Sequence, residues 1–237
     1  MAYYPIFLEL EGRRCVVIGG GNVAEDKVRG LLAAGGDVTV VSPTLTPALH
    51  QHLDEGRFQY VQREYRDGDL GGYEVCMIAT DDGAVNAQVA AEGKRRGVWV
   101  NASDDPKNCD FILPSVVRQG SVVVAASTGG SSPALARRLR EELTAFLSED
   151  YSALNDLLGE VRGELRKRRI SIDAEVWQTA IDGPLRALLS QRRWGQAKAR
   201  LLRSLGVADV FASPVDDPES PSRASGRGDS SAADRAE

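Results

Sequence analysis

Residues 16–27 read VVIGGGNVAEDK and decide the fold of the first part of the chain. The run is apolar as far as Ile18, turns at glycines, and continues as a helical pattern. Gly19, Gly21 and Ala24 fit the G-x-G-x-x-G/A fingerprint: a tight turn, a close backbone approach to a pyrophosphate, and tight helix–strand packing. The helix N-terminus would add N–H donors and a positive dipole end for the phosphates. We therefore predict a dinucleotide site here, the alternative being a plain glycine turn in an α/β sheet.

Strand-like apolar runs alternate with helical patterns along the rest of this part of the chain. Strands are predicted at 15–18, 38–41, 58–61, 75–79 and 98–100, and helices at 23–34, 46–55 and 82–95, with Gly97 as the last helix's cap. Alternation at this spacing predicts a parallel sheet with right-handed crossovers, which is an α/β, Rossmann-like fold.

The pattern changes after residue 111. Residues 111–117 and 121–126 predict a β-hairpin. Ser132 is the expected N-cap and Pro133 the first residue of a helix that follows.

Further helical patterns cover 151–169 and 174–205, the second interrupted at Gly183-Pro184. The segment from residue 213 onward has almost no apolar residues. It is predicted to be disordered because it cannot bury enough surface to offset its ordering entropy.

Composition and charge exclude several classes of protein. The 237 residues are 42% hydrophobic and 27% charged, as expected of an ordinary globular chain, and the net charge of −5 argues against a nucleic-acid binder. No signal peptide or bilayer-spanning stretch is evident, so we expect no membrane association. Three isolated cysteines, of which Cys15 and Cys76 lie in apolar runs, are typical of a reducing cytoplasm.

The segment after the second predicted strand lacks the acid that usually bonds the adenine ribose. It reads Ser42-Pro43-Thr44, so the ribose would be held by Ser42, by Thr44 or by backbone groups. No arginine follows this strand immediately to bind a 2′-phosphate. This pattern favours NAD over NADP.

Polar residues also follow the fourth predicted strand. Ligands of open α/β sheets lie beyond the carboxyl ends of strands, so we expect Thr80 and Asp81 to face the cofactor. Helix capping by Asp81 or Asp82 is the alternative.

The fifth predicted strand leads into VNASDDP, residues 100–106, on the same edge. Of the adjacent carboxylates Asp104 and Asp105, one can face the cleft while the other caps or meets solvent. A carboxylate beside a nicotinamide could take up the proton released when a hydride leaves. A simple Asp-Asp-Pro turn is the alternative.

Four stretches, VVIGGGNVAEDK, ATDD with a following VN, VNASDDPKNCDFILPS and AASTGGSSPALARRLRE, together resemble the siroheme synthase family, precorrin-2 dehydrogenase/sirohydrochlorin ferrochelatase. The resemblance runs from about Pro5 to about Phe146, and it is to the stand-alone enzyme without a methyltransferase domain. It implies oxidation of precorrin-2 to sirohydrochlorin with NAD, and in some members insertion of Fe²⁺. It also implies a homodimer.

The resemblance implies a division of the chain and a set of site residues. An NAD-binding domain would cover 1–112, a small α+β dimerisation domain 113–149, a helical domain 150–210 and a disordered tail 211–237. The catalytic aspartate falls on Asp104. The cofactor contacts fall on Gly21, Asn22, Val23, Pro43 and Thr44, and serine is frequent in the family where this chain has Thr128.

A tetrapyrrole with several carboxylates calls for arginines and backbone N–H groups. The residues expected to bind it are Ser127, Thr128, Gly129, Gly130, Arg118 and Arg137. For Arg137 and the neighbouring Arg138 a solvated helix face is the alternative.

Metal ligands are scarce. His50 and His52 point to different helix faces, so no permanent metal site is expected and iron would be a transient substrate. Two further readings stay open, namely a dehydrogenase without chelatase activity and a non-enzymatic NAD-sensing domain.

Overall fold

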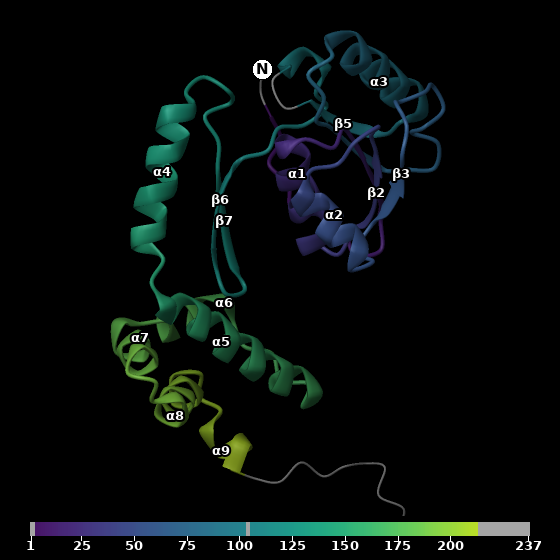
Figure 1. Cartoon of the computed structure of the whole chain (residues 1–237). Helices are drawn as coiled ribbons and strands as arrows, with labels where there is room; N and C mark the ends of the chain where they lie inside the picture. Colours follow the sequence, from purple (N-terminus) through teal and green to yellow (C-terminus); the bar gives the residue numbers. More distant parts are fainter. Residues whose placement is uncertain (1–2, 103–104, 213–237) are drawn as a thin grey trace, which may run out of the picture. The chain divides into compact units, whose positions relative to one another are not determined.

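The computed structural model describes residues 3–102 and 105–212, and it divides into two compact units (Figure 1). One unit contains the described residues up to Ser115 together with Ala126–Arg137. The other contains Val116–Ala125 and the described residues from Arg138 onward. The predicted division into three domains and a tail stays a prediction.

A five-stranded parallel sheet forms the centre of the first unit, in the order β3-β2-β1-β4-β5. The strands are β1 (Arg14–Ile18), β2 (Asp37–Val41), β3 (Gln59–Val61), β4 (Val75–Ile78) and β5 (Trp99–Ala102). The helices between them are α1 (Asn22–Ala33), α2 (Pro47–Asp54) and α3 (Gly83–Arg96). The predicted α/β, Rossmann-like fold is therefore confirmed.

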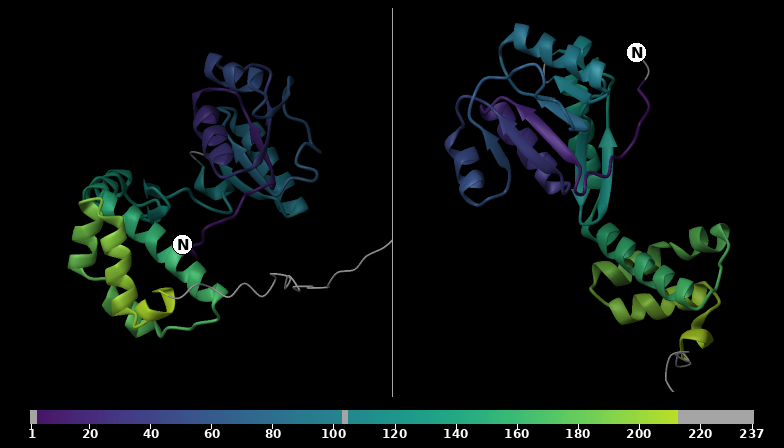
Figure 2. Two further views of the ribbon diagram at one scale, coloured as in Figure 1. Left: turned by 90° about the horizontal axis from the view of Figure 1, so that it is seen from below. Right: turned by 90° about the vertical axis from the view of Figure 1, so that its right-hand side faces the viewer.

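Both faces of this sheet are buried, which explains why its strands are apolar throughout rather than alternating. Cys15 and Val17 of β1 pack in one cluster with the buried residues of α1, including Val28. Val16 and Ile18 face the other way and pack in a second cluster with α3 residues such as Val89. Helices α1 and α3 accordingly cover opposite faces of the sheet, as Figures 1 and 2 show.

The order of the strands places a switch point at the carboxyl end of β1. The chain runs from β1 outward through β2 to β3, and then returns to the other side of β1 to form β4 and β5. Ile18, the last residue of β1, is in register with Val41 and Ile78 of its two neighbours. The loops after β1, β2 and β4 therefore begin at one edge, where open α/β sheets bind their ligands.

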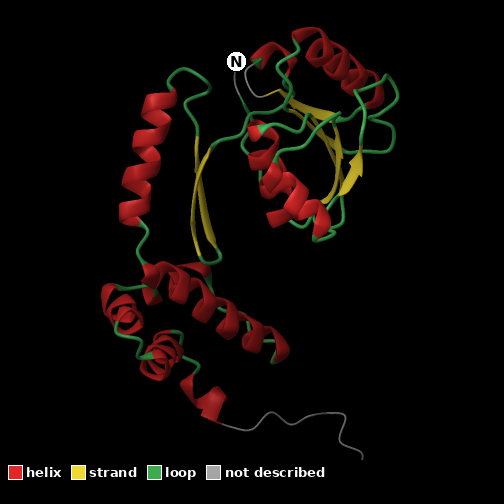
Figure 3. Cartoon of the chain, viewed as in Figure 1, coloured by secondary structure: helices red, strands yellow, loops and turns green. Residues whose placement is uncertain are grey.

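The remaining elements are a hairpin and helices (Figure 3). They are β6 (Ser115–Gln119), β7 (Val122–Ala126), α4 (Pro133–Phe146), α5 (Glu149–Lys167), α6 (Ala174–Ala180), α7 (Gly183–Ser190), α8 (Trp194–Ser204) and α9 (Ala208–Ala212). The predicted hairpin is confirmed, although its first strand begins at Ser115 and runs on to Gln119. Ser132 as N-cap is also confirmed, because Leu135 N donates to Ser132 Oγ at 3.2 Å.

One predicted boundary in the helical region is wrong. The interruption expected at Gly183-Pro184 lies before these residues, which begin α7. Asp182 caps this helix by accepting a hydrogen bond from Leu185 N at 2.8 Å. Pro184 is the second residue of α7, in the first turn, where backbone N–H groups have no partner within the helix, so the dipeptide starts a helix here instead of ending one.

A buried carboxylate, Glu92 of α3, holds the loop between β3 and β4. Its side chain accepts hydrogen bonds from Tyr65 Oη at 2.6 Å and Leu70 N at 3.2 Å, and it pairs with Arg96 at 2.5 Å. Burial alone would raise the pKa of Glu92. The hydrogen bonds from Tyr65, the backbone of Gly68, Arg96 and Leu70 outweigh burial and lower the pKa below its usual 4.5.

We expect the variant Glu92→Gln to unfold about 2 kcal/mol more easily at neutral pH, because it loses the charge-assisted bonds. A lowered carboxyl pKa contributes stability above the unfolded-state value, and this contribution is lost as the pH falls below about 4.5. The variant should therefore lose less stability than the wild type between pH 7 and pH 4 in urea denaturation. Glu64→Gln, a change at an exposed carboxylate in the same loop, is the control. Parallel acid dependence in the wild type and Glu92→Gln would contradict this assignment.

Candidate functional site

Gly19 follows β1 and is packed against the end of β4. Its φ of +119° is a conformation that favours glycine, and its N–H donates to Val41 O at 2.9 Å. A Cβ on Gly19 would lie 2.2 Å from Ala79 O. The glycine is therefore required by contact with the neighbouring strand as well as by the turn.

Gly20, which lies outside the fingerprint positions, is the centre of contact between the loops after β1 and β2. A Cβ at this position would lie 2.1 Å from Thr44 O. Thr46 N donates to Gly20 O at 3.0 Å, and Ser42 Oγ donates to Thr44 O at 2.8 Å. The sequence analysis did not single out Gly20. Its only signal in the sequence is that it is an extra glycine between the two fingerprint glycines.

Gly21 is different from its neighbours because no atom of the described residues occupies the space beside it. A Cβ there would have none of their heavy atoms within 4 Å, and the Gly21 backbone is extended, with φ −86° and ψ −170°. Gly21 is also the N-cap of α1, and no side chain caps that helix end. These features fit the pyrophosphate of a dinucleotide, which needs an open backbone approach and helix N–H donors.

The first turn of α1 lies beside this open position. Asn22 and Val23 begin the helix, and Val23 is exposed. Ala24 is fully buried in the cluster that joins α1 to the sheet, so a larger side chain there would push the helix from β1. Their roles as cofactor contacts stay predictions.

The loop after β2 offers fewer free groups than the sequence suggested. Ser42 is buried, and its hydroxyl is used within its own loop, whereas Pro43 and Thr44 are exposed. This geometry favours Thr44 and the backbone over the Ser42 hydroxyl as ribose contacts.

The loop after β4 shows which of two adjacent acids caps the following helix, a question that the sequence left open. Asp82 is the N-cap of α3, accepting from Ala84 N at 2.8 Å and Val85 N at 3.1 Å. Asp81 is exposed beside it. Thr80 Oγ1 donates to Asn86 Oδ1 at 3.2 Å and accepts from Asp82 N at 3.0 Å.

The segment after β5 carries the predicted catalytic residue. Asp104 itself lies outside the described residues. Asp105 caps the 3₁₀ turn Pro106–Asn108, with Oδ1 accepting from Lys107 N at 3.2 Å and Oδ2 from Asn108 Nδ2 at 2.6 Å. Of the two adjacent carboxylates, Asp105 thus has the capping role.

Two polar side chains brace the end of β5. Asn101 is buried, donates to Phe111 O at 2.9 Å and accepts from Lys27 Nζ of α1 at 3.4 Å. Cys109 Sγ is 3.1 Å from both the N and the O of Ala102. Burial raises the pKa of the Cys109 thiol, so this thiol stays protonated and donates to the backbone.

The predicted substrate loop is arranged mainly by its own hydrogen bonds. Thr128 Oγ1 donates to Ser132 O at 3.1 Å and accepts from Ser132 N at 3.2 Å, while Ser127 Oγ accepts from Gly129 N at 3.0 Å. Gly129 and Gly130 have φ of +64° and +86°, which requires glycine.

Among the nearby arginines, Arg138 is a solvated helix-face residue. It pairs with Glu142 at 2.7 Å with its side chain 68% exposed. Arg118 is exposed on the hairpin and Arg137 on α4.

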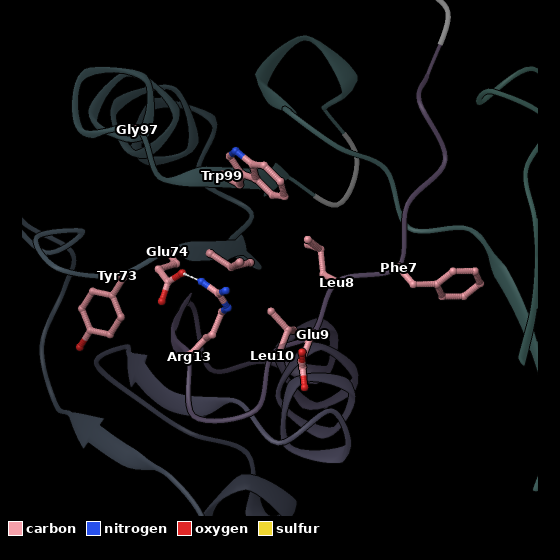
Figure 4. Close-up of a pocket in the computed structure, with 10 residues that line it drawn as sticks. Phe7, Leu8, Glu9, Leu10, Arg13, Tyr73, Glu74, Gly97 and Trp99 are labelled. Carbon is pink, nitrogen blue, oxygen red and sulfur yellow. Dashed lines mark hydrogen bonds and ion pairs between the residues drawn. The ribbon is translucent and has the colours of Figure 1, made fainter. Parts of the chain in front are cut away.

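A pocket of about 390 Å³ lies at the opposite, amino edge of the sheet (Figure 4). Leu8, Leu10 and Trp99 line it around the ion pair between Arg13 and Glu74. Arg13 and Glu74 precede β1 and β4, and Trp99 begins β5. Because ligands of open parallel sheets lie at the carboxyl edge, this pocket is separate from the predicted cofactor site.

Within the described residues, no group of three or more His, Cys, Asp or Glu side chains is placed to hold a metal ion. His52 is within 3.4 Å of Glu55 on α2, and His50 is exposed on the same helix. No helix among the described residues combines the length and apolar character needed to span a bilayer.

Two family models match the chain. Residues 6–115 match NAD_binding_7, described as "Putative NAD(P)-binding", and residues 119–145 match "Sirohaem biosynthesis protein central". The first match covers the five-stranded sheet and its helices, and the second covers β7 and nearly all of α4.

Curated relatives carry the same name repeatedly. Siroheme synthase of Photobacterium profundum is 37% identical over 204 residues, which are 85% of this chain and 44% of that protein. Siroheme synthase 2 of Aeromonas hydrophila is 39% identical over 211 residues, 88% of this chain and 44% of that protein. The chain thus spans less than half the length of these relatives.

A solved structure extends the comparison. SirC, precorrin-2 dehydrogenase, superposes with a TM-score of 0.70 and 28% sequence identity, covering 84% of this chain and 100% of that one. The chain is therefore homologous to the siroheme synthases, over less than half of their length, and it shares its fold with SirC, precorrin-2 dehydrogenase.

Proposed function

We propose that this protein oxidises precorrin-2 to sirohydrochlorin with NAD⁺ as the hydride acceptor. One observation carries the proposal: the similarity to SirC, precorrin-2 dehydrogenase, extends over all of that chain. By contrast, the siroheme synthases are more than twice as long as the part that matches here. A dehydrogenase is therefore the activity for which the chain has all of the corresponding structure.

The glycine turn supports the cofactor assignment. Gly21 and the uncapped first turn of α1 would hold the pyrophosphate, and Thr44 with the neighbouring Pro43 would line the ribose position. Bound NAD⁺ would supply the redox chemistry, while Thr80 and Asp81 after β4 would orient the nicotinamide end. The proposed role of the protein is to bind and align the two reactants.

We assign the proton transfer to Asp104. Oxidation removes a hydride and a proton from the macrocycle, and a carboxylate at the carboxyl edge can accept that proton. The capping role of Asp105 supports this assignment, since it leaves Asp104 as the other member of the pair.

The substrate's carboxylates would be bound by the Ser127–Gly130 turn, by Arg118 and by Arg137. The surface of α4 favours a homodimer. No residue of this helix is buried, and its large apolar side chains Leu135 and Phe146 are 51% and 64% exposed. The three free thiols favour a reducing compartment such as the cytoplasm.

Iron insertion is the second candidate activity. It is favoured by the name shared by the curated relatives and by the match of residues 119–145 to the sirohaem biosynthesis family. Chelation would release two protons from the pyrrole nitrogens as Fe²⁺ enters, and Asp104 could accept one of them while the other passes to water.

Anaerobic incubation with precorrin-2 and NAD⁺ tests both candidates. We expect NADH and sirohydrochlorin to form in equal amounts, and addition of Fe²⁺ then shows whether sirohaem forms above the uncatalysed rate. Oxidation without accelerated iron insertion would leave the dehydrogenase alone. If wild-type protein binds NAD⁺ but produces no NADH, the enzymatic proposal is wrong and a NAD-sensing domain is favoured.

A further inference from the structure

An arginine follows β3, the strand that neighbours β2, although none follows β2 itself in the sequence. Val41 and Val61 are in register at the carboxyl ends of β2 and β3, which neighbour each other in Figure 1. The N–H groups of Ser42 and Arg63 both donate to Val61 O, at 3.3 and 3.0 Å. Arg63 therefore belongs to the edge at which dinucleotide folds distinguish a ribose 2′-hydroxyl from a 2′-phosphate.

The guanidinium of Arg63 is already bound in a fork. Its Nη1 and Nη2 donate to the two carboxylate oxygens of Asp69, each at 2.7 Å, and Nη1 also donates to Glu64 O at 3.0 Å. Asp69 is held in turn by Arg66 N at 2.9 Å, and its side chain is only 11% exposed. The pair is thus fixed by the loop rather than free to rearrange.

A bidentate carboxylate occupies the donors that a phosphate would use, because both anions fit the same guanidinium fork. A 2′-phosphate would have to displace Asp69 or approach its negative charge. A 2′-hydroxyl carries no charge and meets neither obstacle.

We infer that the Arg63–Asp69 pair determines the preference of the cofactor site for NAD over NADP. Asp69 keeps Arg63 from binding a 2′-phosphate, so the arginine that could accept NADP is neutralised within the fold. This inference rests on the proposed function only in requiring that a dinucleotide binds at the glycine turn.

The test is a comparison of NADH and NADPH dissociation constants by fluorescence titration, which needs no tetrapyrrole. Asp69→Asn keeps an acceptor for Arg66 N but removes the charge that holds Arg63. We expect it to tighten NADPH binding about tenfold and to leave NADH binding nearly unchanged. High salt should reduce the gain, since it screens the new contact.

Asp67→Asn is the matched control. Asp67 lies in the same loop and pairs with the exposed Arg95 of α3, so the variant loses the same charge without releasing Arg63. Arg63→Gln combined with Asp69→Asn should abolish the gain in NADPH affinity. Arg63→Gln alone leaves Asp69 unpaired and should weaken NADPH binding further, which keeps the inference testable if Asp69→Asn folds poorly.

The outcomes separate the inference from the function on which it rests. If the wild type binds NADH but Asp69→Asn tightens NADPH no more than Asp67→Asn does, the specificity inference is overturned alone. The same holds if the double variant keeps the gain. Wild-type protein that binds neither nucleotide would overturn the proposed function and this inference together.

Discussion

Asp104→Asn is expected to lower the rate of precorrin-2 oxidation by roughly 10²–10⁴-fold, the usual contribution of a positioned general base. The amide has nearly the same size as the carboxylate but cannot accept the substrate's proton. NADH affinity should be unchanged, because the pyrophosphate and ribose contacts that we propose are on the loops after β1 and β2. Anaerobic NADH formation with precorrin-2, together with NADH titration of the same protein, measures both quantities.

Asp105→Asn is the control for this variant. It removes the same charge from the adjacent position, and the amide oxygen can still accept from Lys107 N as the carboxylate does at 3.2 Å. Its turnover should stay within about threefold of the wild type, which is a smaller effect than the tenfold change that corresponds to about 1.4 kcal/mol. If Asp104→Asn keeps wild-type turnover, or if Asp105→Asn is the slower variant, the proton acceptor has been assigned to the wrong residue.

Gly20→Ala is expected to destabilise the protein by about 3 kcal/mol or more and to abolish cofactor binding. The added methyl would lie 2.1 Å from Thr44 O, a backbone atom that cannot rotate away. Relief of this clash would separate the loops after β1 and β2, breaking the hydrogen bond from Thr46 N to Gly20 O. Overpacking of this kind typically costs 1–3 kcal/mol, and contact with backbone puts it at the upper end.

Urea denaturation of Gly20→Ala measures this effect against Gly30→Ala. Gly30 lies within α1, and a Cβ there would have no heavy atom within 4 Å. Alanine is favoured over glycine inside a helix, so Gly30→Ala should stabilise by about 0.5–1 kcal/mol. Equal unfolding midpoints for the two variants would contradict the packing described at Gly20.

The sheet and the glycine turn were predictable because their signals are local. Apolar runs between glycines mark the parallel strands, and G-x-G-x-x-A marks the first crossover. Gly97, with φ +71° at the end of α3, shows how directly one residue can report a helix boundary.

Other features depend on contacts that the linear pattern does not contain. Gly20 resembles any glycine until the loop carrying Thr44 is placed against it. Ser42 reads as a ribose ligand, yet its hydroxyl donates to Thr44 O within the loop. The Arg63–Asp69 fork becomes relevant to the cofactor only when β3 is placed beside β2. For Gly20 and for the Arg63–Asp69 fork, pairing of neighbouring strands brings the groups together, whereas the Ser42 hydrogen bond depends on how its own loop folds.

The most direct test of the central claim, that the dinucleotide binds at the glycine turn of the carboxyl edge, is NADH titration of Gly21→Ala beside Trp99→Ala. Alanine adopts the backbone of Gly21 without strain and meets no atom of the described residues, so unfolding should change by no more than about 1 kcal/mol, the cost of a poorer N-cap. We expect its methyl to block the pyrophosphate and weaken NADH binding at least about tenfold, a cost of 1.4 kcal/mol or more. Trp99→Ala, which alters the pocket at the amino edge, should bind NADH as the wild type does. Wild-type affinity in Gly21→Ala, or a loss confined to Trp99→Ala, would contradict the account.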